Sequence, residues 1–180
     1  MKKIQSVLVC IIILISLVIG TLRFLCLLYP NDYELAVKKY AKIYDVPPEL
    51  VFSVIKAESN YEEHALSKKG AVGLMQIMES TGDWAAKKLS IENFSRERLY
   101  EPDVNIEIGC FYLSYLLDLY SHDTKCVLAA YNAGPANVDK WLLDDAYSKD
   151  KKTLQKIPYS ETENYVKKVM GNIKIYDFLY

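Results

Sequence analysis

The sequence predicts an all-α fold, with one membrane-spanning helix at the N-terminus and a helical domain after it. Three observations lead to this prediction. A run of 19 uncharged residues lies near the start of the chain, apolar residues recur after it at helical spacings, and no stretch alternates as a β-strand does. The 180 residues suffice for one ordinary domain, and the hydrophobic fraction of 51% excludes a disordered chain.

The uncharged run extends from Ile4 to Leu22 and directly follows two lysines. At about 1.5 Å per residue, a helix of this length spans roughly 28 Å, close to the hydrocarbon thickness of a bilayer. Because basic residues are retained on the cytoplasmic side, Lys2 and Lys3 predict a cytoplasmic N-terminus and an extracytoplasmic domain. Residues 1–30 are therefore predicted to be a single-pass membrane anchor. The alternative is a cleaved signal peptide, which would leave a secreted protein and which the length of the run disfavours.

The composition after the anchor excludes several classes of function. Residues 1–30 hold three basic residues and no acid, so residues 31–180 have 19 basic and 23 acidic residues and a net charge of −4. This balance disfavours a nucleic-acid partner, because such binding depends largely on Lys and Arg. The two histidines and the cysteines form no ligand motif, so neither a metal site nor a cofactor is predicted. Cys110 and Cys126 are expected to be buried and free.

Residues 31–180 are predicted to form one domain of helices joined by short loops. Proline is tolerated in a first helical turn, Asp, Ser or Thr caps an N-terminus, and a Gly-Pro pair ends a helix. On these grounds we expect helices at 32–44, 47–59, 73–78, 80–89, 102–120, 123–133, 135–143 and 160–178. The expected capping residues are Asp32, Ser80 or Thr81, and Asp123. A polar loop is expected at 60–70 and a lysine-rich loop before the last helix.

Glu58 occupies a position in the second predicted helix where an apolar residue is expected. Val51, Val54 and Ile55 stand at spacings of three and four, and the next place on this stripe is Glu58. Burial disfavours the charged form of a carboxyl group and raises its pKa, which suits an acid that must protonate a glycosidic oxygen. On periodicity alone, a glutamate turned to solvent or paired with a lysine is the commoner arrangement.

Four short motifs follow one another along the predicted helical domain. They are Ala57-Glu58-Ser59, residues 70–78 (GAVGLMQIM), residues 130–134 (AYNAG) and residues 161–166 (ETENYV). Together they resemble the soluble, goose-lysozyme-like lytic transglycosylases, over roughly residues 32–178. The resemblance implies a lysozyme-like domain with an active-site cleft at residues 31–180, and peptidoglycan glycan strands as the substrate.

In that family the glutamate matched by Glu58 is the single catalytic acid and base. The resemblance implies that Glu58 protonates the oxygen between N-acetylmuramic acid and N-acetylglucosamine. It then accepts a proton from the 6-hydroxyl of the sugar, which closes on the anomeric carbon and leaves a 1,6-anhydro end. Most glycosidases that use water need two carboxylates, but here Glu62, Glu63 and Glu79 lie in polar stretches and are expected at the surface.

The resemblance also implies substrate-binding roles for residues beside the acid and in the second motif. Ser59 would contact the substrate or orient Glu58. Gly73 would let the backbone approach a sugar, Met75 would pack at the cleft, and Gln76 would hydrogen-bond the glycan. Met78 is expected to fill the core instead.

The last two motifs are implied to supply the rest of the substrate-binding site. Tyr131 and Asn132 would form a wall of the cleft, and the hydroxyl of Tyr165 would meet Glu58. The chain departs from the family at Glu79, where members commonly have proline, and this change removes no catalytic group.

Two other functions remain open on the sequence. One is a hydrolytic muramidase of the same fold, and the other is a weakly active peptidoglycan-binding scaffold of a cell-envelope assembly. The intact set of Glu58, Gln76, Asn132 and Tyr165 disfavours the scaffold. A serine hydrolase is excluded because the sequence has no G-x-S-x-G motif.

Overall fold

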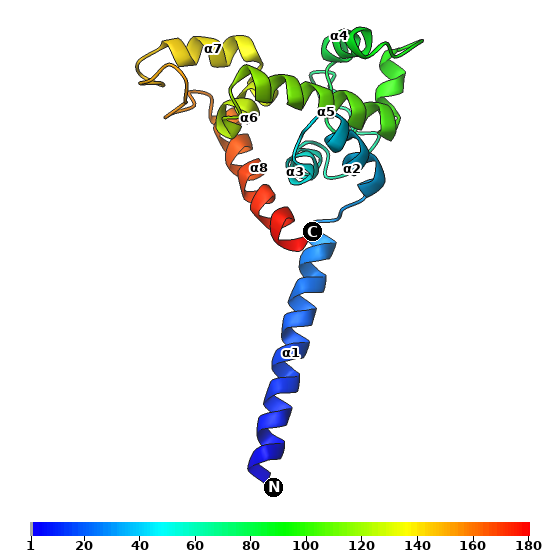
Figure 1. Ribbon diagram of the computed structural model, residues 1–180, viewed down its shortest axis with the longest axis vertical. Helices are drawn as coiled ribbons and strands as arrows, with labels where there is room; N and C mark the ends of the chain where they lie inside the picture. Colours follow the sequence, from blue (N-terminus) through cyan, green and yellow to red (C-terminus); the bar gives the residue numbers. More distant parts are fainter. Residues whose placement is uncertain (1) are drawn as a thin grey trace. The chain divides into compact units, whose positions relative to one another are not determined.

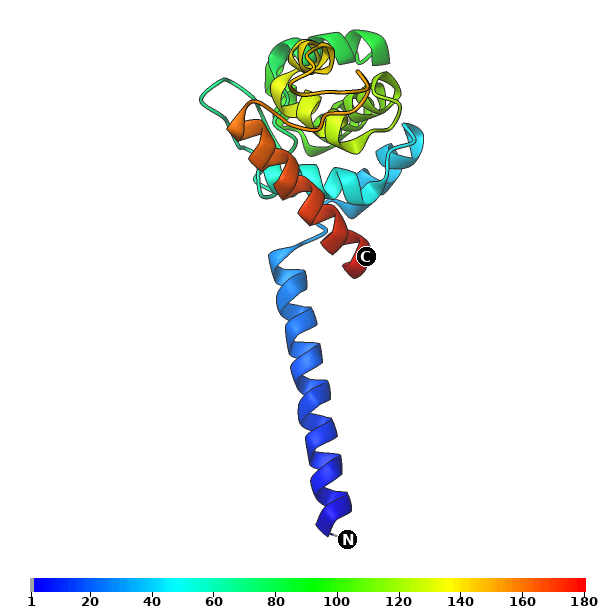
Figure 2. The same cartoon turned by 90° about the vertical axis from the view of Figure 1, so that its left-hand side faces the viewer.

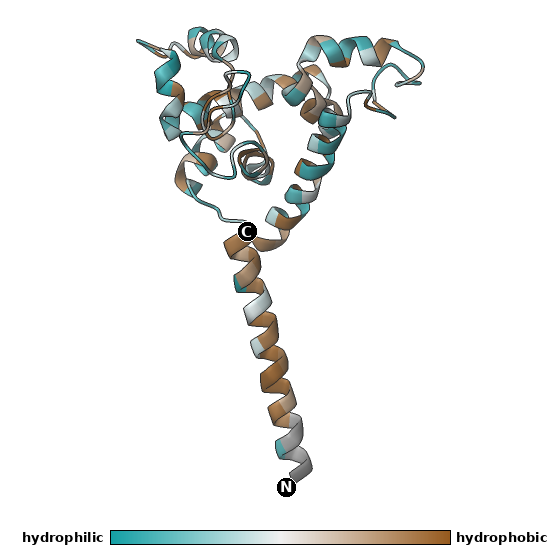
Figure 3. Cartoon of the chain, turned by 180° about the vertical axis from the view of Figure 1, so that it is seen from behind, coloured by the Kyte–Doolittle hydropathy of each residue, from teal (hydrophilic) through white to brown (hydrophobic). Residues whose placement is uncertain are grey.

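The computed structural model describes residues 2–180, which form helices joined by turns and loops (Figure 1). The chain divides into two compact units, one up to Asn31 and the other from Asp32 to Phe178. The first unit is a single helix, α1 (Lys2–Leu28). Its segment Leu8–Leu28 has a mean hydropathy of 2.7, and Figure 3 shows the hydrophobic colour along most of it. This is the predicted N-terminal helix long and apolar enough to cross a membrane; a signal sequence satisfies the same criteria.

The second unit is a helical domain. Its elements are α2 (Glu34–Ile43), α3 (Pro48–Glu58), α4 (Glu79–Leu89), the 3₁₀ helix η1 (Arg96–Tyr100), α5 (Pro102–Leu119), α6 (Thr124–Ala133), α7 (Pro135–Leu143) and α8 (Ser160–Leu179). Within residues 2–180, β-pairing is limited to two isolated bridges, Leu66–Val72 and Val72–Ile77. The predicted all-α fold is therefore confirmed.

Local sequence signals set several helix boundaries as predicted. Pro48, Pro102 and Pro135 stand in the first turns of α3, α5 and α7, where their missing N–H is not needed. The carboxylate of Asp123 caps α6 by accepting a hydrogen bond from the backbone N–H of Cys126 at 2.7 Å. Cys126 is buried and free, as is Cys110 on α5, which confirms the expectation for both.

Two predicted caps are wrong. The N-cap of α2 is Tyr33 and not Asp32. Tyr33 has a φ of 61°, which lies in the left-handed region and cannot continue a right-handed helix. The N-cap of α4 is Met78, two or three residues before the predicted cap, so Ser80 and Thr81 lie inside the first turn. Neither helix start has a capping side-chain hydrogen bond.

The short helix predicted at 73–78 does not form. Residues 60–78 make a loop that the two bridges tie together. Gly73 and Gln76 have φ values of 76° and 49°, which belong to the left-handed region and cannot continue a right-handed helix. The second motif is therefore a folded loop, which we call the 60–78 loop.

The core of the helical domain surrounds α5. This helix crosses the domain and contacts α2, α4, α6 and η1 (Figure 1). Its residues Ile106, Ile108, Leu113 and Leu116 are fully buried. Burial of apolar side chains such as these is the dominant favourable contribution to the free energy of folding. Both the 60–78 loop and α6 pack against this helix.

The last helix, α8, is attached to α3 (Figures 1 and 2). Lys168 donates a hydrogen bond to the carbonyl of Ala57 at 2.8 Å, and Asn172 donates to the carbonyl of Ser53 at 3.4 Å. One turn further on, Tyr176 stacks on Phe52 with ring centroids 5.5 Å apart. These contacts bring the ETENYV motif at the start of α8 to the end of α3, where Glu58 lies.

Candidate active site

Glu58 lies at the C-terminal end of α3, on the same stripe as three core residues. Val51, Val54 and Ile55 are completely buried, and Glu58 is half-buried where the stripe leaves the core. Burial raises the pKa of Glu58 to about 7, partly offset by the hydroxyl of Tyr165 and by the positive charge of Lys168. A carboxyl group with this pKa is present in both protonation states at neutral pH. The predicted acid is thus neither paired with a lysine nor fully turned to solvent.

The Tyr165 hydroxyl faces this carboxyl group. It is buried and, among the described residues, has no partner within ordinary hydrogen-bond limits. It is nevertheless close enough to the Glu58 carboxylate to lower the pKa of Glu58. Burial, and then the charge of Glu58, raise the pKa of Tyr165 well above its usual value, so this hydroxyl stays protonated. A buried donor that lies beside an acid without a full hydrogen bond is available to a rearranged Glu58 carboxylate.

Tyr131 and Asn132 stand in the last turn of α6. The Tyr131 hydroxyl donates to the carbonyl of Met75 at 2.8 Å, and its pKa is raised first by burial and then by the nearby charge of Glu58. The Asn132 side chain accepts a hydrogen bond from the Thr162 hydroxyl at 2.8 Å. The third motif therefore joins the 60–78 loop on one side and the start of α8 on the other.

Within the 60–78 loop, Gln76 and Gly73 have clear structural functions. The Gln76 amide donates to the carbonyls of Ala65 at 3.2 Å and Gly73 at 2.9 Å. Gly73 is buried, and a Cβ atom there would lie 2.4 Å from the carbonyl oxygen of Leu99. Glycine is thus required for packing inside the protein, which corrects the prediction that it brings the backbone to a sugar.

The two methionines of this loop have exchanged their predicted positions. The side chain of Met75 is fully buried against Gly109 of α5, where an added Cβ would lie only 2.2 Å from its sulfur. Met75 therefore fills the core and has no exposed surface for a sugar, which corrects its predicted substrate contact. Met78, expected in the core, is 41% exposed at the start of α4.

Ser59 follows Glu58 directly but is not hydrogen-bonded to it. Its hydroxyl donates to the carbonyl of Ile55, one turn earlier in α3, at 3.3 Å. The side chain is half-buried. A contact of Ser59 with substrate stays a prediction.

Asn105 is the important residue that the sequence analysis missed. This buried side chain of α5 accepts a hydrogen bond from the Met75 N–H at 2.8 Å and donates to the carbonyls of Val72 at 3.0 Å and Leu99 at 2.7 Å. It thus satisfies two backbone groups of the 60–78 loop, which has no regular structure, and one backbone carbonyl of η1. The available signal was an amide side chain three and four residues before the core positions Ile108 and Gly109.

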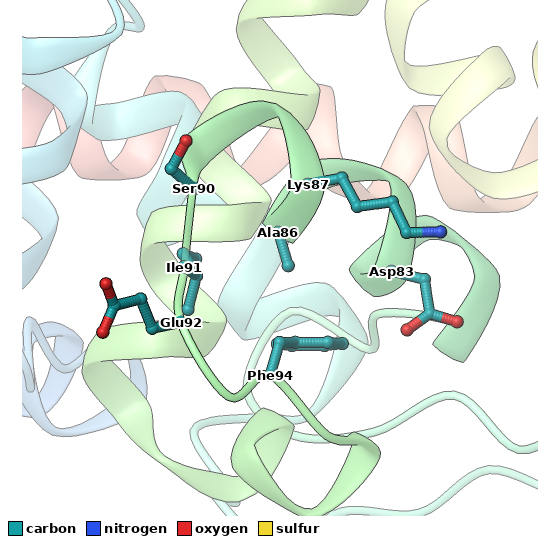
Figure 4. Close-up of a pocket in the computed structure, with 7 residues that line it drawn as sticks. All are labelled: Asp83, Ala86, Lys87, Ser90, Ile91, Glu92 and Phe94. Carbon is teal, nitrogen blue, oxygen red and sulfur yellow. The ribbon is translucent and has the colours of Figure 1, made fainter.

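A separate cavity of about 430 Å³ lies between α4 and the chain that follows it. Figure 4 shows its lining, which comes from α4 and the chain that follows it and includes Asp83, Lys87 and Phe94. The predicted site residues lie elsewhere, at the ends of α3 and α6, in the 60–78 loop and on α8. This cavity is not part of the candidate site.

These features define a helical domain with a half-buried acid at a helix end. Residues 36–155 match the family model described as the Transglycosylase SLT domain. The chain therefore belongs to the Transglycosylase SLT domain family. Its fold is the lysozyme-like one of that family, as two solved structures show: an inactive mutant of the lytic transglycosylase Slt from Pseudomonas aeruginosa and the 70 kDa soluble lytic transglycosylase from Escherichia coli. Each has a TM-score of 0.75 over 83% of this chain, with 32% and 33% sequence identity.

Two relatives illustrate the range of similar proteins. The soluble lytic murein transglycosylase of Escherichia coli strain K12 is 35% identical over 145 residues, which are 79% of this chain and 22% of that protein. The membrane-bound lytic murein transglycosylase C of Actinobacillus pleuropneumoniae is 32% identical over 162 residues, covering 77% of this chain and 44% of that protein. This chain thus spans about a fifth of the length of the soluble relative and less than half of the membrane-bound one.

Proposed function

We propose that the chain is a lytic transglycosylase that cleaves the β-1,4 bond between N-acetylmuramic acid and N-acetylglucosamine in peptidoglycan. The observation that carries this proposal is the half-buried Glu58, whose pKa is raised to about 7. A group with this pKa can give a proton and take one back near neutral pH, as a single acid and base must. Membership of the family and the names of the relatives support the same activity.

The reaction would proceed in two proton transfers. Protonated Glu58 gives its proton to the glycosidic oxygen, which leaves with the electron pair of the broken bond. Glu58, now a carboxylate, takes the proton of the 6-hydroxyl, and that oxygen bonds to the anomeric carbon to give a 1,6-anhydro end. Water is not consumed. Tyr165, as a permanent donor beside Glu58, would hold the carboxylate during this exchange.

The glycan would lie across the ends of α3 and α6. Ser59, Gln76, Tyr131 and Asn132 remain the proposed binding residues, with Gln76 and Tyr131 acting largely through the 60–78 loop that they hold. Residues 31–180 form the proposed catalytic domain. Residues 1–30 would anchor it in the cell membrane, as the apolar helix α1 and the membrane-bound relatives support. Lys2 and Lys3 support a cytoplasmic N-terminus.

Product analysis tests the proposal. Purified peptidoglycan is digested with the full chain in detergent, and the muropeptides are identified by mass spectrometry. We expect 1,6-anhydro ends from the wild type and at least a 1,000-fold slower release from Glu58→Gln, because the amide cannot supply a proton. In the Pseudomonas aeruginosa relative a single glutamate-to-glutamine substitution gives an inactive protein.

The matched control is Glu62→Gln, the same change at an exposed glutamate four residues further on. It should digest peptidoglycan as the wild type does. Reducing muramic acid ends would instead identify a hydrolytic muramidase. Equal activity of Glu58→Gln and the wild type would remove Glu58 as the acid.

A further inference from the structure

The backbone of Met75, in the 60–78 loop, is held by side chains of two different helices. Its N–H donates to Oδ1 of Asn105 on α5 at 2.8 Å, and its carbonyl accepts a hydrogen bond from the hydroxyl of Tyr131 on α6, also at 2.8 Å. The Met75 side chain is fully buried against Gly109. The carbonyl of Met75 is therefore fixed in front of the Tyr131 hydroxyl.

The amide of Asn105 fits its surroundings in one orientation. The side chain is fully buried, and its Nδ2 group donates to the carbonyls of Val72 at 3.0 Å and Leu99 at 2.7 Å. A flipped amide would set its NH₂ group against the Met75 N–H and its oxygen against the two carbonyls, which would leave buried groups unpaired. The Met75 N–H therefore always faces an acceptor.

The Tyr131 hydroxyl has one proton, and two acceptors lie near it. The proton is held by the Met75 carbonyl. The hydroxyl is also close enough to Glu58 for the carboxylate charge to raise the pKa of Tyr131. If the Met75 carbonyl turned away, Tyr131 would be free to donate to the Glu58 carboxylate in addition to Tyr165, whose hydroxyl already lowers the pKa of Glu58. A second donor would stabilise the carboxylate and lower this pKa further.

Other charged and titratable groups also face these two residues. Lys168 of α8 faces Glu58, and its positive charge lowers the pKa of that carboxyl group. Tyr112 and Cys110 of α5 face Tyr131. Burial raises the pKa of Tyr112 to about 12 and that of Cys110 well above its usual value, so both stay neutral while Glu58 titrates. The direction of the Tyr131 proton is thus the feature near Glu58 that a hydrogen-bond partner decides.

We propose that Asn105 is a positioning residue for the cleavage reaction: it fixes the Met75 peptide and so keeps the Tyr131 proton away from the catalytic acid. This inference rests on the proposed function. Asn105 acts through two intermediate groups, the Met75 peptide and the Tyr131 hydroxyl. Its effect is to leave Glu58 with a single neighbouring hydroxyl donor, so that the carboxyl group can regain a proton near neutral pH.

The test measures the titration of Glu58 itself, without substrate. The full chain, in detergent, is labelled with carbon-13 at the glutamate side-chain carboxyl groups, and the Glu58 NMR signal is identified by its loss in Glu58→Gln. We expect a midpoint at about pH 7 in the wild type. In Asn105→Ala the midpoint should be lower by about one pH unit, the effect of one added ordinary hydrogen bond. The alkaline limb of kcat/KM on peptidoglycan should move in the same direction.

Two further variants separate this action from a general loss of packing. Asn172→Ala removes another buried asparagine, which donates to the carbonyl of Ser53 at 3.4 Å, and should leave the midpoint unchanged. Tyr131→Phe removes the second donor, so Asn105→Ala should have no further effect on the midpoint in that background. A midpoint that falls equally in Asn172→Ala, or equally with and without the Tyr131 hydroxyl, would overturn the proposal.

A measurement on the wild type applies even where Asn105→Ala does not fold. The Tyr131 hydroxyl proton is hydrogen-bonded and is followed by proton NMR, with its signal assigned by its loss in Tyr131→Phe. We expect its contacts with the Met75 backbone to persist between pH 5 and 9. A proton that leaves the Met75 carbonyl as Glu58 ionises, or an unchanged or raised midpoint in folded Asn105→Ala, would contradict the proposal. The proposed function fails separately, if digestion of peptidoglycan by the wild type yields no anhydro ends.

Discussion

Two carboxyl groups of the helical domain lie in opposite surroundings. Glu58 is half-buried at the end of α3, and burial raises its pKa to about 7. Asp150 lies in the exposed loop between α7 and α8 and accepts hydrogen bonds from the backbone N–H groups of Lys152 at 2.9 Å and Thr153 at 2.8 Å. The Thr153 hydroxyl donates a third at 2.7 Å. These donors hold the pKa of Asp150 far below its usual value.

The difference shows what each carboxyl group is able to do. Asp150 is fixed as an anion by its donors, so it stabilises its loop and cannot exchange a proton near neutral pH. Glu58 lacks such a set of donors, and its pKa of about 7 lets it both donate and accept a proton near neutral pH. This state has a cost: because the folded domain binds that proton more tightly than the unfolded chain does, the free energy of unfolding decreases as pH rises from about 4.5 to about 7.

The largest expected effect concerns the pH dependence of activity. If protonated Glu58 is the acid, kcat/KM should fall about tenfold for each pH unit above 7, and so about 100-fold by pH 9. Asp150 is already ionised throughout this range and contributes nothing. Initial rates on purified peptidoglycan between pH 5 and 9 measure the profile. A constant rate up to pH 9 would mean that another group supplies the proton.

The fold could be predicted where the signal is local. Proline in a first turn and the cap at Asp123 depend on a few neighbouring residues, and the starts of α5, α6 and α7 were predicted correctly from them. The 60–78 loop could not be predicted in this way. Its backbone is held by Asn105, thirty residues further along than Met75, so no local pattern reveals its shape.

The same limit applies to the candidate site. The break in the apolar stripe at Glu58 was visible in the sequence, and the structure places Tyr165 and Tyr131 beside it. Which methionine is buried was not visible, because the close approach of Gly109 to Met75 decides it. The shape of the lysine-rich loop was not visible either, because the hydrogen bonds that organise it converge on Asp150, a residue with no distinguishing pattern.

A smaller effect is expected from Lys168, which faces Glu58 from α8. Its ammonium group donates to the carbonyl of Ala57 and its charge lowers the pKa of Glu58, while Tyr165 and Tyr131, the other titratable groups there, stay neutral. Lys168→Met should therefore raise the pKa of Glu58 and move the alkaline limb of the activity profile up by about half a pH unit. The effect is modest because Lys168 is exposed and water screens its charge.

Two variants separate charge from packing at this position. Lys168→Arg keeps the charge and should keep the wild-type profile. Lys167→Met removes the neighbouring charge, which pairs with Glu163 at 2.8 Å, and should leave the profile unchanged. A limb that moves down, or moves equally in Lys167→Met, would contradict an electrostatic action of Lys168 on Glu58.

The smallest effect is expected from Asp150→Asn, which removes the charge and keeps the shape. One side-chain oxygen accepts both backbone hydrogen bonds, and asparagine retains an oxygen there, so the loop should stay folded and the melting temperature should fall by only a few degrees. Because the pKa of Asp150 is lowered by folding, its stabilisation is present above about pH 4 and is lost as pH falls through the folded-state value. The difference in melting temperature between wild type and variant should therefore shrink in strong acid, as calorimetry at pH 7 and pH 2 would measure. Digestion of peptidoglycan should be unchanged. A loss of activity would show that Asp150 contributes to the reaction and not only to the stability of its loop.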